Sequence, residues 1–274
     1  MPEDMKNKIR VMLTSTAAIQ EPEERSRKYR NIVGILAQEA VRSGDTWYLE
    51  EALKTAGLVT IDPSKAYVDI IRAMARIGTN RKDEKIPRNA LKITERIDNS
   101  LDLSVALHEL VVAFAKIGID KKDEKILSYS LNLTEKVPLD TYRSSAFRNI
   151  AKLHAGANPK RALELLETAI ELIEKSKGIE PVYFISAFCD IAAQLAKLND
   201  ERSYGFITRA IALADDIADV FEKSAILLKI VETEIAVGAQ KHDEKLLKEA
   251  SVISSGITRE YYKTLALDAI KRID

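Results

Sequence analysis

The strongest constraint on this chain is a short charged motif that recurs at a fixed spacing. Lys-Asp-Glu-Lys occurs at Lys82–Lys85 and again, 40 residues later, at Lys122–Lys125. A near copy, His-Asp-Glu-Lys, occupies His242–Lys245, three such intervals further on. A period of this size is typical of proteins built from stacked copies of one unit. We interpret the motif as a turn and helix start, in which Asp83 and Asp123 cap exposed N–H groups; the alternative is a repeated binding motif.

The repeating unit is predicted to be a pair of helices joined by a short polar turn. Apolar residues recur at helical spacing over Ser64–Ile77 and again over Ile86–Ile97. Gly78 is expected to end the first helix, because glycine readily takes the left-handed conformation found at helix C-termini. The same order returns 40 residues later in Leu107–Ile117 and Ile126–Val137. Extended to the whole chain, the pattern predicts roughly fourteen helices in about seven pairs, with no strand signal.

The predicted fold class is all-α, a right-handed α-solenoid of antiparallel helical hairpins. We expect residues 1–274 to form a single continuous solenoid. Residues 1–24 would carry an N-terminal capping helix over Met5–Ile19. Residues 258–274 would carry a C-terminal capping helix, Tyr261–Ile273, that has no second helix of its own.

Two stretches resemble tetratricopeptide (TPR) repeats. Gly44–Leu53 and Asn158–Leu166 each place a Gly or Asn turn before a helix rich in Ala and Leu. The chain departs from that family in its period, which is near 40 residues where the family repeats at about 34 and is closer to the length of HEAT-type repeats. The resemblance implies a curved scaffold that binds other proteins, and it brings no catalytic residue with it.

Composition narrows the function classes. The chain has 42 basic and 42 acidic residues, whereas a dedicated nucleic-acid binder normally has a basic excess. It has one cysteine, Cys189, and neither zinc-ligand spacing nor a glycine-rich phosphate loop, so we expect no cofactor or metal. Without a signal-peptide pattern or a long apolar run, a cytoplasmic location with no membrane contact is predicted. Scarce Gln and abundant Glu, Lys and Arg favour a thermophilic source.

One column of polar residues stands beside the predicted core of the first helices. A polar side chain immediately precedes a core residue in six successive copies: Asn31, Asp69, Glu109, Asn149, Asp190 and Lys229. If the first helices line a concave face, this column forms a ladder along the groove. The alternative is a solvated face that makes some helix-to-helix hydrogen bonds.

Basic residues gather on the same predicted helices in the N-terminal half. They include Lys65, Arg72, Arg76, Arg143 and Lys152. The hypothesis is that a groove around Arg72, His108, Arg148 and Lys152 binds an acidic segment of a partner; the alternative is surface bases neutralised by nearby acids. The candidate partner-binding groove comprises Asp69, Arg72, His108, Glu109, Arg148, Asn149 and Lys152.

The sequence therefore favours a non-enzymatic scaffold or adaptor that binds a protein or peptide in a concave helical groove. A nucleic-acid-associated factor is the alternative, and an enzyme with a site in the groove is ranked below it. His108 and His154 are expected to be neighbours one repeat apart, and Cys189 is expected to be a buried apolar side chain. The apolar side of the C-terminal helix, with Leu265, Leu267 and Ile270, predicts either packing back on the chain or contact with another copy.

Overall fold

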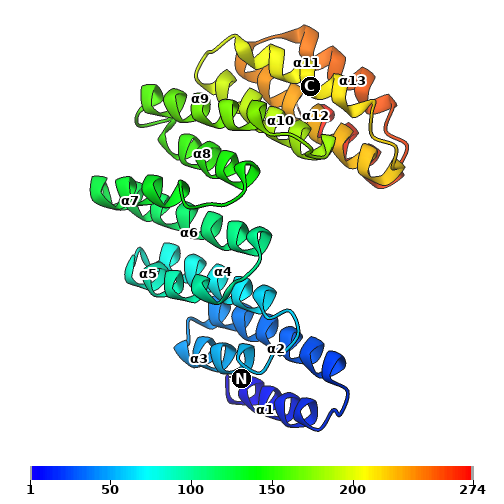
Figure 1. Cartoon of the computed structure of the whole chain (residues 1–274). Helices are drawn as coiled ribbons and strands as arrows, with labels where there is room; N and C mark the ends of the chain where they lie inside the picture. The colour runs from blue at the N-terminus through cyan, green and yellow to red at the C-terminus, as the bar shows by residue number, and fades with distance from the viewer. Residues whose placement is uncertain (1, 273–274) are drawn as a thin grey trace. The chain divides into compact units, whose positions relative to one another are not determined.

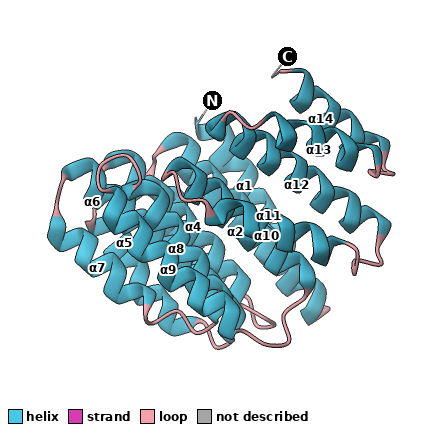
Figure 2. Cartoon of the chain, turned by 90° about the horizontal axis from the view of Figure 1, so that it is seen from above, coloured by secondary structure: helices cyan, strands magenta, loops and turns pink. Residues whose placement is uncertain are grey.

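The structure is a computed structural model that describes residues 2–272. Within that range the protein is all-α, with fourteen α-helices, one 3-10 helix and no strand (Figure 2). None of these helices combines the length and the apolar character that crossing a lipid bilayer requires. The all-α prediction is confirmed.

The chain divides into two compact units, Met1–Ala146 (unit 1) and Phe147–Asp274 (unit 2). Figure 1 labels the helices. The helices of unit 1 are α1 (Pro2–Ala17), α2 (Pro22–Ser43), α3 (Thr46–Ala56), α4 (Ser64–Arg81), α5 (Lys85–Leu91), the 3-10 helix η1 (Lys92–Arg96), α6 (Ser100–Lys121) and α7 (Glu124–Thr134). Helix α8 (Asp140–His154) crosses the boundary between the units. The helices of unit 2 are α9 (Pro159–Lys175), α10 (Pro181–Lys197), α11 (Arg202–Ala214), α12 (Val220–Lys241), α13 (Glu244–Ser255) and α14 (Glu260–Lys271).

Long helices pack beside one another in chain order, and each packs on a shorter helix that follows it. In unit 1, α2 contacts α3 and α4, while α4 contacts α5 and α6, and α6 contacts α7. In unit 2, α10 contacts α11 and α12, and α12 contacts α13 and α14. The apolar positions that predicted these helices are buried, as Ile70, Ile71 and Ile77 show on α4. Burying such side chains stabilises the fold by about 1.5–3 kcal/mol each.

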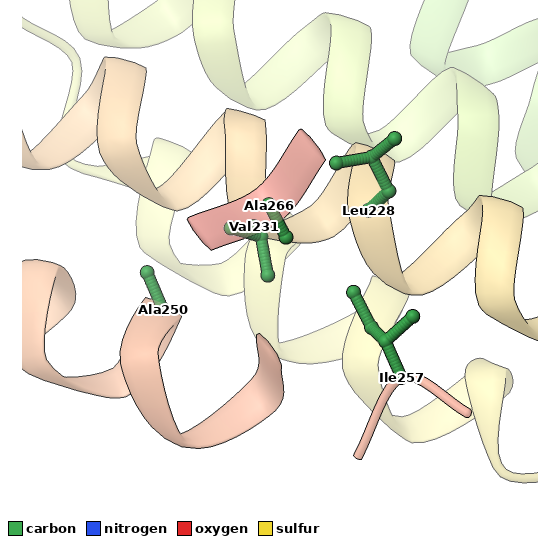
Figure 3. Close-up of a cluster of buried hydrophobic side chains, with 5 residues drawn as sticks. All are labelled: Leu228, Val231, Ala250, Ile257 and Ala266. Atoms are coloured by element: carbon green, nitrogen blue, oxygen red, sulfur yellow. The ribbon is translucent and has the colours of Figure 1, made fainter. Parts of the chain in front are cut away.

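The core of unit 2 continues to its last helix. Leu228 and Val231 of α12 meet Ala250 of α13, Ile257 of the following turn and Ala266 of α14 (Figure 3). Helix α14 therefore packs on the chain through this cluster. The predicted terminal helices lie close to their expected bounds, although Ile273 falls outside the described residues.

The Lys-Asp-Glu-Lys motif forms the corner between a long helix and its short partner. Lys82 takes the left-handed conformation (φ 52°), and the Asp83 N–H donates to the Gly78 carbonyl at 2.9 Å. The Asp83 carboxylate then accepts from the Lys85 N–H at 3.0 Å. This pattern ends α4 and starts α5 within a few residues, because each orphaned N–H or carbonyl finds a partner. The prediction that Asp83 and Asp123 cap helix starts is confirmed.

The same corner recurs at the second identical motif and at its near copy. Lys122 and His242 are left-handed at φ 52° and 55°, and each precedes a capping aspartate. A fourth copy, at Asn199–Arg202, has the same geometry: Asn199 has φ 59°, and the Asp200 N–H donates to the Leu195 carbonyl at 2.9 Å. Its sequence, Asn-Asp-Glu-Arg, keeps the Asp-Glu pair and a basic fourth residue, while asparagine replaces lysine at the left-handed position.

The prediction that Gly78 ends its helix is wrong. Helix α4 continues to Arg81, and Lys82 takes the left-handed position. Glycine is needed at 78 for a different reason, since a Cβ there would lie 2.5 Å from Cδ of Pro87. At Gly118 a Cβ would lie 2.8 Å from Cγ of Leu127. These glycines let the second helix of a pair approach the first.

The second predicted helix, Ile86–Ile97, is also different in the structure. It forms α5 and then tightens into the 3-10 helix η1. The Thr94 hydroxyl donates to the Leu91 carbonyl at 2.6 Å, three residues back, which accompanies the tighter winding.

Buried serines link three of the long helices, α2, α6 and α12, to the segments that lead into α4, α8 and α14. The Ser26 hydroxyl accepts from the Thr60 N–H at 3.2 Å. Ser104 accepts from the Leu139 N–H at 3.1 Å, and Ser224 from the Arg259 N–H at 3.4 Å. We call these three contacts the serine latches. Each closes a loop of 34 or 35 residues.

Candidate functional site

In unit 1, three residues of the predicted groove form one ion-pair chain. On α4, Arg72 Nη1 lies 3.3 Å from Asp69 Oδ1. Arg72 Nε donates to Glu109 Oε1 of α6 at 3.1 Å. The guanidinium therefore joins two adjacent long helices. Because all three side chains are partly exposed to water, the pairs contribute less than about 1 kcal/mol each.

A hollow of about 360 Å³ lies between α2 and α4 beside this ion-pair chain. Its lining comes from one stripe of each helix: Gly34, Ala37, Gln38, Val41 and Arg42 on α2, and Asp69, Arg72, Ala73 and Arg76 on α4. These positions recur every three or four residues, so each set lies on one face of its helix. We call this site the α2–α4 hollow.

The charges of the α2–α4 hollow are unevenly matched. Arg42 donates to Glu39 through Nε at 2.9 Å, and Arg72 pairs with Asp69 and Glu109. Burial raises the pKa of Asp69, while the nearby Arg72 opposes that shift. Arg76 is exposed, and its side chain makes no hydrogen bond or ion pair with any other residue in the described part of the chain. The hollow therefore has one guanidinium without a carboxylate partner.

A neutral donor faces Arg76 from the other wall. The Gln38 side chain is exposed and, within residues 2–272, is also without a hydrogen-bond partner. Ala37 and Ala73 are almost completely buried between the two polar side chains. An apolar floor with free donors at its rim is a typical composition for a binding site.

In unit 2, the polar column forms a second ion-pair chain. Arg148 Nη1 of α8 lies 2.9 Å from Asp190 Oδ2 of α10. Lys229 Nζ of α12 lies 3.0 Å from the other oxygen of Asp190 and donates to Ser186 Oγ at 2.6 Å. One carboxylate thus joins three helices. These contacts match the alternative in which the polar column makes helix-to-helix bonds.

Arg148 is not available as a surface base. The residue is 8% exposed, and its Nε has no hydrogen-bond partner. Burial lowers the pKa of its guanidinium, against the opposing effect of Asp190. A partly desolvated cation of this kind stabilises the chain only while its carboxylate partner stays in place.

The remaining predicted site residues lie around α8. His108 Nε2 is 3.1 Å from Ser145 Oγ, and its ring meets Tyr142 edge-to-face at 6.3 Å between ring centroids. Asn149 is half-buried on α8, and Lys152 is exposed near the end of that helix. The structure therefore brings Asp69, Arg72 and Glu109 together, pairs Arg148 with Asp190, and sets His108 beside Ser145 and Tyr142.

A second hollow, of about 380 Å³, lies between α3, α4 and α5. Its wall includes Arg81, which donates from Nη2 to the Gly44 carbonyl at 2.7 Å. Most of the lining is apolar and includes Leu49, Leu53, Met74, Ile77 and Ile86. Its ionisable groups do not converge on a common point, so it offers shape without a directing charge.

The described residues hold no cluster of metal ligands, and their one cysteine is buried. No group of three His, Cys, Asp or Glu side chains in residues 2–272 could hold a metal ion. Cys189 is buried, and burial raises the pKa of its thiol to about 11, which keeps it protonated near neutral pH. This agrees with the prediction that Cys189 is a small buried apolar side chain.

Sequence reasoning missed the α2 wall of the hollow. Arg76 was noted only as one of several bases, and Gln38 and Arg42 were not considered. The available signal was the four-residue spacing of Gly34, Gln38 and Arg42, which places a small residue and two polar side chains on one helical stripe.

Comparisons with known proteins give little further guidance. No family model matches the chain, and no curated protein matches it. The chain is similar over 96% of its length, and over 95% of the other chain, to the structure titled "Crystal structure of Ton1535 from Thermococcus onnurineus NA1". The identity is 14% and the TM-score is 0.26, so the likeness adds nothing to the fold described above. The structure itself defines an all-α protein with many helix–helix contacts.

Proposed function

We propose that this protein is a TPR-like helical-repeat scaffold, an α-solenoid of hairpins, that binds an acidic segment of a partner protein in the α2–α4 hollow. The repeat is supported by four corners with the same backbone geometry, at Lys82, Lys122, Asn199 and His242. It is also supported by the neighbour-to-neighbour packing of the long helices. A non-enzymatic role, a cytoplasmic location and a thermophilic source remain predictions from the sequence.

The observation that carries the proposal is the unpaired guanidinium of Arg76 at the rim of the hollow. A guanidinium presents parallel N–H donors that match a carboxylate, and such bidentate bonds are among the stronger polar contacts. Arg42 and Arg72 are held by Glu39, Asp69 and Glu109, so they shape the site without adding free charge. The hollow therefore suits one carboxylate at a time, with the Gln38 amide as a second donor.

The same pairing argues against the nucleic-acid alternative. Binding to a phosphate backbone relies on several cations that are free to release counterions. In the hollow, two of the three arginines already face carboxylates. An acidic protein segment requires less positive charge, because its carboxylates can be spaced to meet single cations.

The experiment compares two pools of fluorescently labelled peptides of about a dozen residues, one rich in Asp and Glu and one with Asn and Gln in their place. Fluorescence anisotropy should show tighter binding of the acidic pool to the full chain. Arg76→Glu should weaken that binding by about tenfold or more, the loss expected for a charge-assisted hydrogen bond. Arg27→Glu is the matched control, because Arg27 is an exposed arginine of α2 outside the lining.

The result that would overturn the proposal is equal binding of the two pools, or equal loss in the Arg76 and Arg27 variants. Either outcome would mean that the hollow does not select carboxylates.

A further inference from the structure

Helix α14 has the sequence register of a first helix. Thr264–Ile270 lies 40 residues after Ser224–Ile230 of α12, so Leu267 stands where Leu227 stands in α12. In other copies this position packs on the short helix that follows. Phe188 of α10 meets Phe206 of α11 at 5.5 Å between ring centroids, and Tyr67 of α4 receives Arg96 of η1 over its ring.

Leu267 is more exposed than the residues at this position in α4, α10 and α12, of which Leu227 is partly buried. Tyr67 and Phe188 are 6% and 3% exposed, whereas Leu267 is 41% exposed. Helix α14 packs against α12 and α13 through Ala266 (Figure 3). Tyr262 and Ile270 are partly buried against the same cluster. Within residues 2–272, no helix covers the Leu267 side. A helix antiparallel to α14 is what the other copies have at this position.

The exposed stripe has the spacing of a helix–helix seam. Glu260, Thr264, Leu267 and Lys271 follow one another at intervals of four, three and four residues. This is the spacing at which one side of a helix meets a second helix along its length. The four residues define what we call the α14 stripe.

Two copies of the α14 stripe carry complementary charges when their helices run antiparallel. Glu260 and Lys271 lie at opposite ends, and neither forms an ion pair with another described residue. An antiparallel copy of the same stripe would place Glu260 opposite Lys271 of the second copy at both ends, and Thr264 opposite Leu267 at the centre. A two-fold symmetric contact is self-complementary in this way.

We propose that the α14 stripe is the contact surface for a second copy of this chain, with the two α14 helices antiparallel. Each copy then covers the Leu267 side of the other, which no helix of residues 2–272 covers. Because the contact is small and has polar ends, the dimer is weak and concentration-dependent. This proposal does not depend on ligand binding in the α2–α4 hollow.

The test is sedimentation velocity on the full chain over a dilution series, with charge-swapped variants. The wild-type chain should pass from monomer to dimer as its concentration rises. Glu260→Lys and Lys271→Glu should each weaken the dimer by about tenfold, since each creates two like-charge contacts per dimer. The double variant carrying both changes should restore the wild-type affinity. Asp268→Lys, an exposed change on α14 outside the stripe, is the control and should leave it unchanged.

A wild-type chain that stays monomeric throughout the series would overturn the proposal. A dimer whose affinity neither single variant changes would also overturn it, and so would a double variant that dimerises as weakly as the single variants. In either case the contact would lie elsewhere. Circular dichroism of each variant confirms that these exposed changes leave the helices intact.

Discussion

Among single residues, Glu234 on α12 has the environment least suited to its charge. Its side chain is completely buried, and neither carboxyl oxygen has a hydrogen-bond partner. Burial, with a smaller contribution from Glu249 on α13, raises its pKa to about 8. Besides burial, the negative charge of Glu234 also raises the pKa of the Cys189 thiol on α10. Glu234 is therefore protonated in the folded protein at neutral pH, and ionised in the unfolded chain.

This difference predicts a loss of stability as pH rises. Below about pH 4.5 the carboxyl is protonated in both states, and above about pH 8 it is ionised in both. Between these values the folded state binds the extra proton, so unfolding becomes easier by roughly 1.4 kcal/mol per pH unit. Urea unfolding of wild type and Glu234→Gln across about pH 5 to 8 should show the variant gaining a growing advantage in stability as pH rises. A difference that does not change with pH would show that the pKa of Glu234 is near its ordinary value.

At the level of helices, the corners show which features the sequence could predict and which it could not. The spacing of Lys-Asp-Glu-Lys correctly predicted where short helices begin and that Asp83 and Asp123 cap them. The role given to Gly78 was wrong because a glycine near a helix end resembles a terminator, whereas here lysine takes the left-handed position. The copy at Asn199 was missed because its first and last residues differ from the motif, although asparagine also accepts the left-handed conformation.

The corner glycines are predicted to be essential for packing. Gly118→Ala would place a Cβ against Leu127 and should destabilise the protein by about 1–3 kcal/mol, the usual effect of overpacking. Gly205→Ala is the matched control, because Gly205 lies within α11 and a Cβ there meets nothing within 4 Å. That change should stabilise by about 0.5–1 kcal/mol, since alanine favours the helix. Urea denaturation measures both, and equal effects of the two changes would contradict the packing role.

The candidate site was only partly predictable, also for reasons of packing between elements. Asp69 and Glu109 were found because they occupy one polar column of the predicted repeat, and Arg72 because basic residues gather on the same helices. Their mutual contacts, and the α2 wall with Gln38 and Arg42, depend on how two helices some thirty residues apart are rotated against each other. Periodicity gives the face of one helix, but it does not give the rotation between two helices.

For the molecule as a whole, contacts between neighbouring helices predict local rather than global responses to damage. The serine latches offer a matched pair, because Ser104 belongs to unit 1 and Ser224 to unit 2. Replacing either with Ala leaves a backbone N–H without its acceptor and should destabilise its surroundings by about 1–3 kcal/mol.

Hydrogen exchange is the measurement that separates the two latches. Ser104→Ala should speed exchange in α6 and its neighbours in unit 1, and Ser224→Ala should do so around α12 and α14 in unit 2. Uniformly faster exchange throughout residues 2–272 in either variant would mean that the two units unfold as one.

The latches also bear on how a chain of this kind could lengthen. In each latch a serine hydroxyl accepts a hydrogen bond from a backbone N–H that lies 34 or 35 residues downstream. Because the donor is a backbone group, its position along the chain decides the bond, and the side chain of the donor residue does not. A duplicated segment of one period would bring its own serine, its own corner and its own backbone N–H donor for the preceding serine. Such a tandem copy would pack beside its neighbours without any new contact having to arise.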